Sequence, residues 1–99
     1  MHPYISSLGK LVSYNVPSGS AVEVAPSSGT YDDETIEADA KRVYLHMHAS
    51  GNIRLTFKDP ADPDFTSDYW VTFGNDVELW YTGPVWVDGS TAIAVIAGY

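Results

Sequence analysis

The sequence predicts an all-β fold: a single antiparallel β-sandwich, or jelly-roll-like domain, with a short N-terminal arm. Short runs of alternating apolar and polar residues recur along the chain, and turn-forming residues separate them at nearly regular intervals. No segment carries a convincing 3.6-residue apolar period of an amphipathic helix. With 99 residues and no internal repeat, the chain is expected to fold around one modest core.

Residues 1–9 are expected to form an extended arm ahead of the sandwich domain, which is assigned to residues 10–99. The arm has no clear period, but it carries the apolar side chains of Tyr4, Ile5 and Leu8. These three residues are predicted to dock on a partner. Because no basic stretch followed by an apolar run begins the chain, a secretory signal is not expected.

Two short strands are expected next, at residues 11–16 and 21–24, because each run ends at a turn that contains proline and glycine. Residues 31–39 hold five acidic residues and a single aliphatic residue larger than alanine. This composition predicts an edge strand or a loop rather than a helix.

The segment 41–58 has the clearest strand pattern. Apolar and polar residues alternate on both sides of the short link 49–52, which predicts a β-hairpin with one face in the core. The expected core phase consists of Val43, Leu45, Met47, Ile53, Leu55 and Phe57. The opposite phase of the first strand carries Tyr44, His46 and His48.

Residues 59–68 are predicted to form a loop, because two prolines and four aspartates in ten residues oppose both a helix and a central strand. Short strands are expected to follow at residues 69–73, 77–81, 85–87 and 91–97.

The three tryptophans are predicted to face outward. In the late strands the core phase carries Tyr69, Val71 and Phe73, then Val77, Leu79 and Tyr81, then Val85 and Val87. Trp70, Trp80 and Trp86 fall on the other phase, as Tyr44 does in the central segment. Since large aromatic side chains dominate interfaces, these four residues are predicted to bind a partner. Alternatively, the rings cover sheet edges, pack under the acidic loop, or are shifted by a bulge.

The net charge of −8 argues against two classes of partner. Nucleic-acid binding needs a basic stripe that displaces phosphate counterions, and anionic membrane surfaces need basic side chains for the same reason. Neither nucleic acid nor a membrane is therefore expected as a partner.

The sequence offers no convincing catalytic or metal site. His46 and His48 project to the same side of a strand, as in the HxH pair that begins cupin metal sites, but no carboxylate or further histidine follows at the required spacing. The aspartates of residues 59–68 do not match a calcium loop. Without cysteine, and without a serine in a nucleophile context, no triad is apparent. We expect no cofactor, no metal and no enzymatic activity.

Residues 36–97 resemble small virion proteins of tailed bacteriophages, the capsid decoration (cement) or head-associated β-sandwiches. The resemblance rests on the strand and turn patterns of residues 38–45, 51–57, 75–79, 83–87 and 91–95. It implies a non-enzymatic subunit on the capsid surface, bound to the major capsid protein and assembled as a homo-oligomer, with a trimer favoured. It also implies that the N-terminal arm contacts neighbouring subunits.

Two classes of function are therefore expected. The first is a decoration subunit that binds and stabilises a viral shell, with a tail or fibre component as its variant. The second is a carbohydrate-binding β-sandwich, in which the three tryptophans form one stacking platform.

Overall fold

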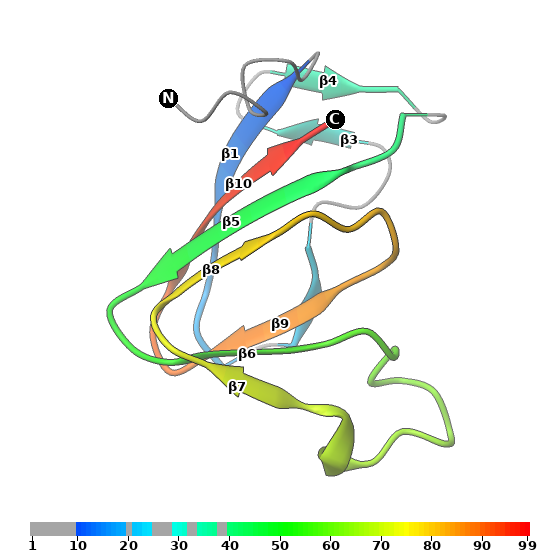
Figure 1. Cartoon of the computed structure of the whole chain (residues 1–99), viewed down its shortest axis with the longest axis vertical. Coiled ribbons are helices and arrows are strands. Elements are labelled where there is room, and N and C mark those ends of the chain that lie inside the picture. Colours follow the sequence, from blue (N-terminus) through cyan, green and yellow to red (C-terminus); the bar gives the residue numbers. More distant parts are fainter. Residues whose placement is uncertain (1–9, 20, 25–28, 32–33, 38–39) are drawn as a thin grey trace.

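Two four-stranded antiparallel sheets pack face to face, which confirms the predicted all-β sandwich (Figure 1). The computed structural model describes residues 10–19, 21–24, 29–31, 34–37 and 40–99. Sheet A has the strand order β1-β10-β5-β8, sheet B has the order β2-β9-β6-β7, and β3 pairs with β4 separately. Among the described residues there is no long apolar helix that could cross a membrane.

The strands lie close to their predicted positions. The strands of sheet A are β1 (Leu11–Val16), β5 (Tyr44–Ala49), β8 (Asp76–Leu79) and β10 (Ile93–Gly98). Those of sheet B are β2 (Val22–Glu23), β6 (Ile53–Thr56), β7 (Val71–Phe73) and β9 (Trp86–Gly89). The acidic segment 31–39 contributes to the small pair β3 (Gly29–Tyr31) and β4 (Glu34–Ile36), and a short 3₁₀ turn, Ser67–Tyr69, ends the loop before β7.

The predicted hairpin at residues 41–58 is wrong. β5 belongs to sheet A and β6 to sheet B, so the link between them crosses from one sheet to the other. Within the two large sheets, β6 and β7 are the one sequence-adjacent pair that is hydrogen-bonded. Alternation requires only that each strand bury one face, and an opposing sheet satisfies this requirement as well as a paired neighbour does.

The core lies between the sheets and includes many residues of the predicted inner phases. It contains β1, β5, β8 and β10 side chains from sheet A and those of β6, β9 and the segments flanking β2 and β9 from sheet B. Its largest fully buried aliphatic members are Leu45, Met47, Ile53, Leu55, Ile93, Val24, Val85, Val87 and Val95. These residues form a single hydrophobic cluster.

A buried arginine connects segments of the two sheets by hydrogen bonds at one end of the sandwich. Arg42, which precedes β5, is 4% exposed, and its Nη1 donates to the carbonyl oxygen of Val24 at 3.1 Å. Its Nη2 donates to the carbonyl oxygen of Tyr81 at 3.2 Å and also to that of Gly83. Burial lowers the pKa of the Arg42 guanidinium. One side chain of sheet A thus satisfies carbonyl groups after β2 and in the connection from β8 to β9.

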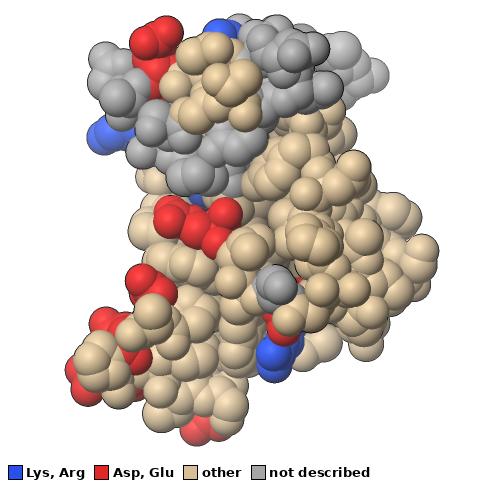
Figure 2. Space-filling model, turned by 180° about the vertical axis from the view of Figure 1, so that it is seen from behind, with Lys and Arg blue, Asp and Glu red and all other residues tan. Residues whose placement is uncertain are grey.

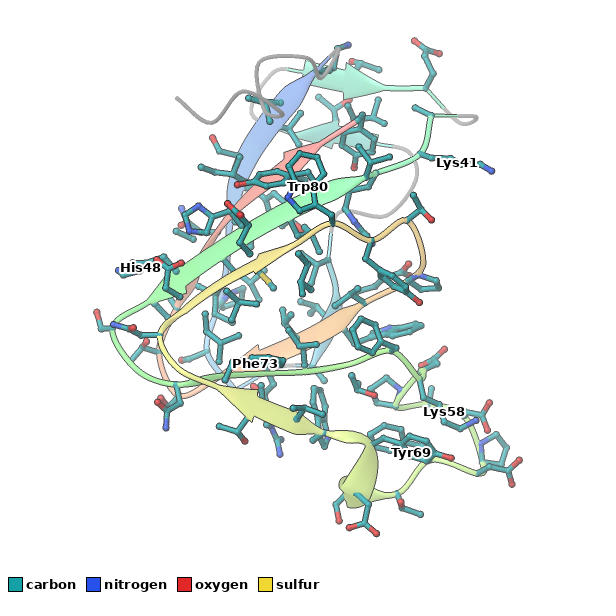
Figure 3. The ribbon with its side chains drawn as sticks, in the orientation of Figure 1. Lys41, His48, Lys58, Tyr69, Phe73 and Trp80 are labelled. Atoms are coloured by element: carbon teal, nitrogen blue, oxygen red, sulfur yellow. The ribbon has the colours of Figure 1, made fainter. Side chains whose placement is uncertain are left out.

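Replacing Arg42 by alanine is expected to lower the free energy of unfolding by about 3 kcal/mol, because buried carbonyl groups lose their donors. Urea denaturation followed by tryptophan fluorescence measures this change. Lys41→Ala is the matched control, since the neighbouring Lys41 side chain points into solvent (Figure 3). Equal stability of the two variants would contradict the role given to Arg42.

Candidate functional site

The three tryptophans do not share a surface. Trp80 directly follows β8 in sheet A, whereas Trp86 lies in β9 and Trp70 directly precedes β7 in sheet B. Each indole lies on the outward-facing side of its own strand. The outer faces of the two sheets, however, point in opposite directions. The expected single tryptophan platform is therefore wrong, because alternation assigns a residue to a face of its strand and not to a sheet.

Tyr44 and Trp80 form a pair on the outer face of sheet A. Their ring centroids are 4.6 Å apart, and Tyr44 is only 1% exposed, so it does not present the contact surface that the sequence predicted. Its hydroxyl donates to Glu78 Oε2 at 2.8 Å; burial, followed by this hydrogen bond, raises the pKa of Tyr44 to about 12. Trp80 remains 47% exposed and points outward (Figure 3).

The two histidines of β5 meet a carboxylate from the neighbouring strand. Asp76 on β8 lies 2.8 Å from His46 Nε2 through Oδ1 and 3.2 Å from His48 Nδ1 through Oδ2. The hydrogen bond to His46, and secondarily that to His48, lowers the pKa of Asp76. In the described part of the chain, no group of three or more His, Asp or Glu residues is arranged to hold a metal ion.

On the outer face of sheet B, Trp70 and Trp86 are half-buried. The Arg54 guanidinium lies 4.4 Å from the centre of the Trp70 ring, and its Nη2 donates to Asp88 Oδ2 at 2.8 Å. Thr56, directly opposite Trp86, is 1% exposed although it faces outward. These two indoles therefore take part in packing on this face, in line with the alternative that the rings cover part of a sheet.

Five of the exposed large apolar side chains belong instead to the predicted core phase. Together we call them the open apolar edge: Phe57, Tyr69, Val71, Phe73 and Tyr81. These side chains are between 37% and 49% exposed, although all five were expected inside. Phe73 and Tyr69 are visible along the lower part of the molecule in Figure 3.

The strand register explains why two of these residues, Val71 and Phe73, face the core and yet remain exposed. Phe73 lies opposite Ile53, and Val71 lies opposite Leu55, so both share the inner face of sheet B. Ile53 and Leu55 are fully buried, whereas β7 is the outermost strand of its sheet. Sheet A therefore covers β6 and does not cover β7. Phe57, directly after β6, packs on Tyr81, with ring centroids 4.8 Å apart.

Acidic side chains border this surface. The segment 59–68 between β6 and β7 carries Asp59, Asp62, Asp64 and Asp68, and acidic groups gather at that end of the molecule in Figure 2. Asp59 and Asp62 each accept a backbone N–H two residues ahead at 2.8 Å. These local turns use carboxylate oxygens that a calcium ion would need. Lys58 balances part of the charge, since its Nζ lies 3.7 Å from Asp62 Oδ2.

The structure thus brings together a different set of residues from the predicted one. Tyr4, Ile5 and Leu8 lie outside the described residues. Trp70, Trp86 and Tyr44 are wholly or partly covered by their own chain, and Trp80 stands on the opposite sheet from Trp70 and Trp86. The residues of the open apolar edge were missed as contact residues. For Val71 and Phe73 the alternation identified the face correctly, but no local signal showed that this face stays exposed at the edge strand.

Comparison of the chain with family models, with curated proteins and with solved structures gave no match.

The Asp76 cluster predicts a pH-dependent contribution to stability. Because folding lowers the pKa of Asp76, its contribution is present above the unfolded carboxyl pKa of about 3.9 and is lost as the pH falls through the lower folded value. Wild type should therefore melt at a higher temperature than Asp76→Asn between about pH 5 and 7, and this difference should shrink below about pH 4.

Thermal melts across this range test the prediction, with Asp64→Asn in the exposed acidic segment as the control. A wild-type advantage over Asp76→Asn that stays constant down to about pH 3 would show that the carboxylate contributes nothing through its ionisation.

Proposed function

We propose that this chain is a non-enzymatic structural protein of a virus, a decoration subunit that attaches to the outside of a capsid shell through the open apolar edge. The observation that carries this proposal is the exposure of five side chains of the predicted core phase, two of which, Val71 and Phe73, lie on the inner face of the edge strand β7. Contiguous apolar surface on a soluble domain marks an interaction site more often than not. The resemblance to phage decoration proteins supplies the shell as the partner.

The topology supports the proposal at the level of fold. If the eight strands of the two large sheets are numbered in chain order, the sheets have the orders 1-8-3-6 and 2-7-4-5. We infer that this is a jelly roll, in which successive strands alternate between two sheets except for the fourth and fifth, here β6 and β7, which pair within one sheet. Viral capsid proteins use this architecture, and so do lectins, so the topology favours a binding module without choosing its ligand.

The charge of the molecule indicates which partner surface would be electrostatically complementary to it. An acidic segment flanks the open apolar edge, and the whole chain carries a net charge of −8. A second copy of the chain would bring like charges together at this edge. We therefore propose an apolar patch rimmed by lysine or arginine on the major capsid protein. Binding of this kind stabilises the shell, because the subunit binds the assembled state and not the separated one.

Assembly of the subunit as a trimer on the capsid surface belongs to the same proposal. A tail or fibre component is the alternative location. The second expected class, a carbohydrate platform of three tryptophans, loses its structural basis because the indoles lie on opposite faces.

Co-sedimentation tests the attachment. Shells assembled from the major capsid protein of the same genome are mixed with the purified chain and pelleted. Wild type is expected to pellet with the shells and to raise their melting temperature. The double variant Val71→Ser/Phe73→Ser should bind at least about tenfold more weakly, because two side chains that become buried each contribute roughly 1.5–3 kcal/mol.

Leu11→Ser is the matched control, since Leu11 is 41% exposed on β1, the edge strand of the other sheet. The three proteins should have the same far-UV spectrum. Wild type that stays in the supernatant, or an equal loss of binding in the control, would overturn the proposal. Pelleting with tails and not with shells would move the protein to the alternative location.

A further inference from the structure

We propose that the partner attaches by strand addition: an extended segment of the partner pairs its backbone with the free edge of β7 and continues sheet B. The strand addition rests on the attachment proposed above and specifies what covers the open apolar edge. β7 is the outermost strand of its sheet (Figure 1), and all three of its residues are exposed. A strand that has a neighbour on one side only presents its remaining backbone groups on the other side.

The direction of the backbone groups in β7 is the first observation. The N–H of Ile53 donates to the carbonyl oxygen of Gly74 at 3.2 Å, so Ile53 directs its backbone toward β7. Because these directions alternate along an antiparallel pair, the next residue, Arg54, faces β9. Thr72 lies opposite Arg54 and therefore directs its N–H and C=O away from β6, to the edge where a further strand would lie.

The second observation is that the side chains beside this edge suit a strand as their cover. Val71 and Phe73 lie on the inner face of sheet B, opposite the buried Leu55 and Ile53, and both remain exposed. A strand added to β7 places every second side chain over this inner face, where it can pack on both residues. Since β7 has only three residues, an added strand makes few backbone hydrogen bonds, and these apolar contacts supply the rest of the affinity.

Two other edge strands lack this combination. β8, the edge strand of sheet A that follows β7 in the chain, carries Asp76 and Glu78, and charged side chains oppose pairing with a further strand. β1, at the other edge of sheet A, carries no charge, but its inward side chains Val12 and Val16 are buried. β7 has neither a charged residue nor proline, and its sequence, Val-Thr-Phe, consists of residues that favour strands.

The charge around β7 disfavours a second copy and selects the partner segment. The acidic segment 59–68 leads into β7, and Asp68 lies three residues before Val71. Two copies paired through β7 would bring their acidic segments together, which opposes that arrangement. We therefore assign the edge to an extended segment of the major capsid protein that has apolar residues at alternate positions and lysine or arginine beside them.

Thr72→Pro tests the strand addition in the co-sedimentation experiment with shells. Proline removes the outward N–H and is tolerated at an edge where that group faces solvent, so the fold and the side chains of Val71 and Phe73 are retained. Binding is expected to fall at least about tenfold, because a strand can no longer pair at the centre of β7. Thr72→Ala keeps the N–H and is the matched control, which should bind as wild type does. Both variants should have the far-UV spectrum of wild type.

Hydrogen exchange of the wild-type chain tests the same point without a substitution. Mass spectrometry with fragmentation to single residues measures exchange of the Thr72 amide in the free protein and on the shell. This amide is expected to exchange rapidly in the free protein and at least about tenfold more slowly on the shell, because the added strand accepts its hydrogen bond.

The outcomes separate strand addition from the attachment itself. Wild type that does not pellet with shells would overturn both. If wild type and Thr72→Pro pellet equally while Val71→Ser/Phe73→Ser does not, the attachment stands and strand addition is wrong. An equal loss of binding in Thr72→Ala would also overturn strand addition, because the side chain and not the backbone would then be responsible. Should Thr72→Pro unfold, hydrogen exchange decides, and an unchanged rate at Thr72 on the shell would contradict strand addition.

Discussion

Each strand of this sandwich has to bury one side of its pleat against the opposite sheet, and most other features of the molecule follow from how far the two sheets overlap. Where they overlap, the inward side chains of β5 and β6 pack into one hydrophobic cluster. Where sheet A ends, at β8, the outermost strand of sheet B continues without a cover. The open apolar edge therefore consists of apolar side chains of the core phase that the opposite sheet leaves exposed. Burial of these side chains by a partner would therefore release free energy.

The overlap is maintained at one end by Arg42. Chains that cross repeatedly between two sheets leave carbonyl groups at the crossings that no ladder can pair. A lysine in this place would offer one compact charge, whereas the planar guanidinium donates in several directions at once. Arg42 uses that geometry to reach the segments after β2 and after β8 from its position before β5. Most of the acidic side chains that the structure describes lie on the surface instead.

The two outer faces illustrate different uses of polar and aromatic side chains. On sheet A, Asp76 and Glu78 pair with His46, His48 and Tyr44, so the titratable groups satisfy one another. On sheet B, Arg54 pairs with Asp88 and lies over the Trp70 ring, so a charged side chain and an aromatic ring pack together on this face.

Several properties could be predicted from the sequence because they depend on neighbouring residues only. Period-two alternation predicted the strand positions, the inner phases of β5 and β9, and the outward phases of the tryptophans. The prolines and aspartates of residues 59–68 predicted the loop. The phases of Tyr44 and Phe73 were also correct, but their exposure was not: the outward Tyr44 ring packs against Trp80 and is buried, and the inward Phe73 ring is exposed.

What the sequence by itself determined, then, is which side of each strand is apolar and where each strand ends, since both are set within a few residues of backbone. The tertiary structure alone decided that β5 and β6 separate into different sheets, that the tryptophans divide between two opposite faces, and that β7 lies beyond the cover of sheet A. The physical reason is that strand pairing and sheet width arise from hydrogen bonds between segments far apart in the chain, and alternation within one strand is compatible with many such pairings.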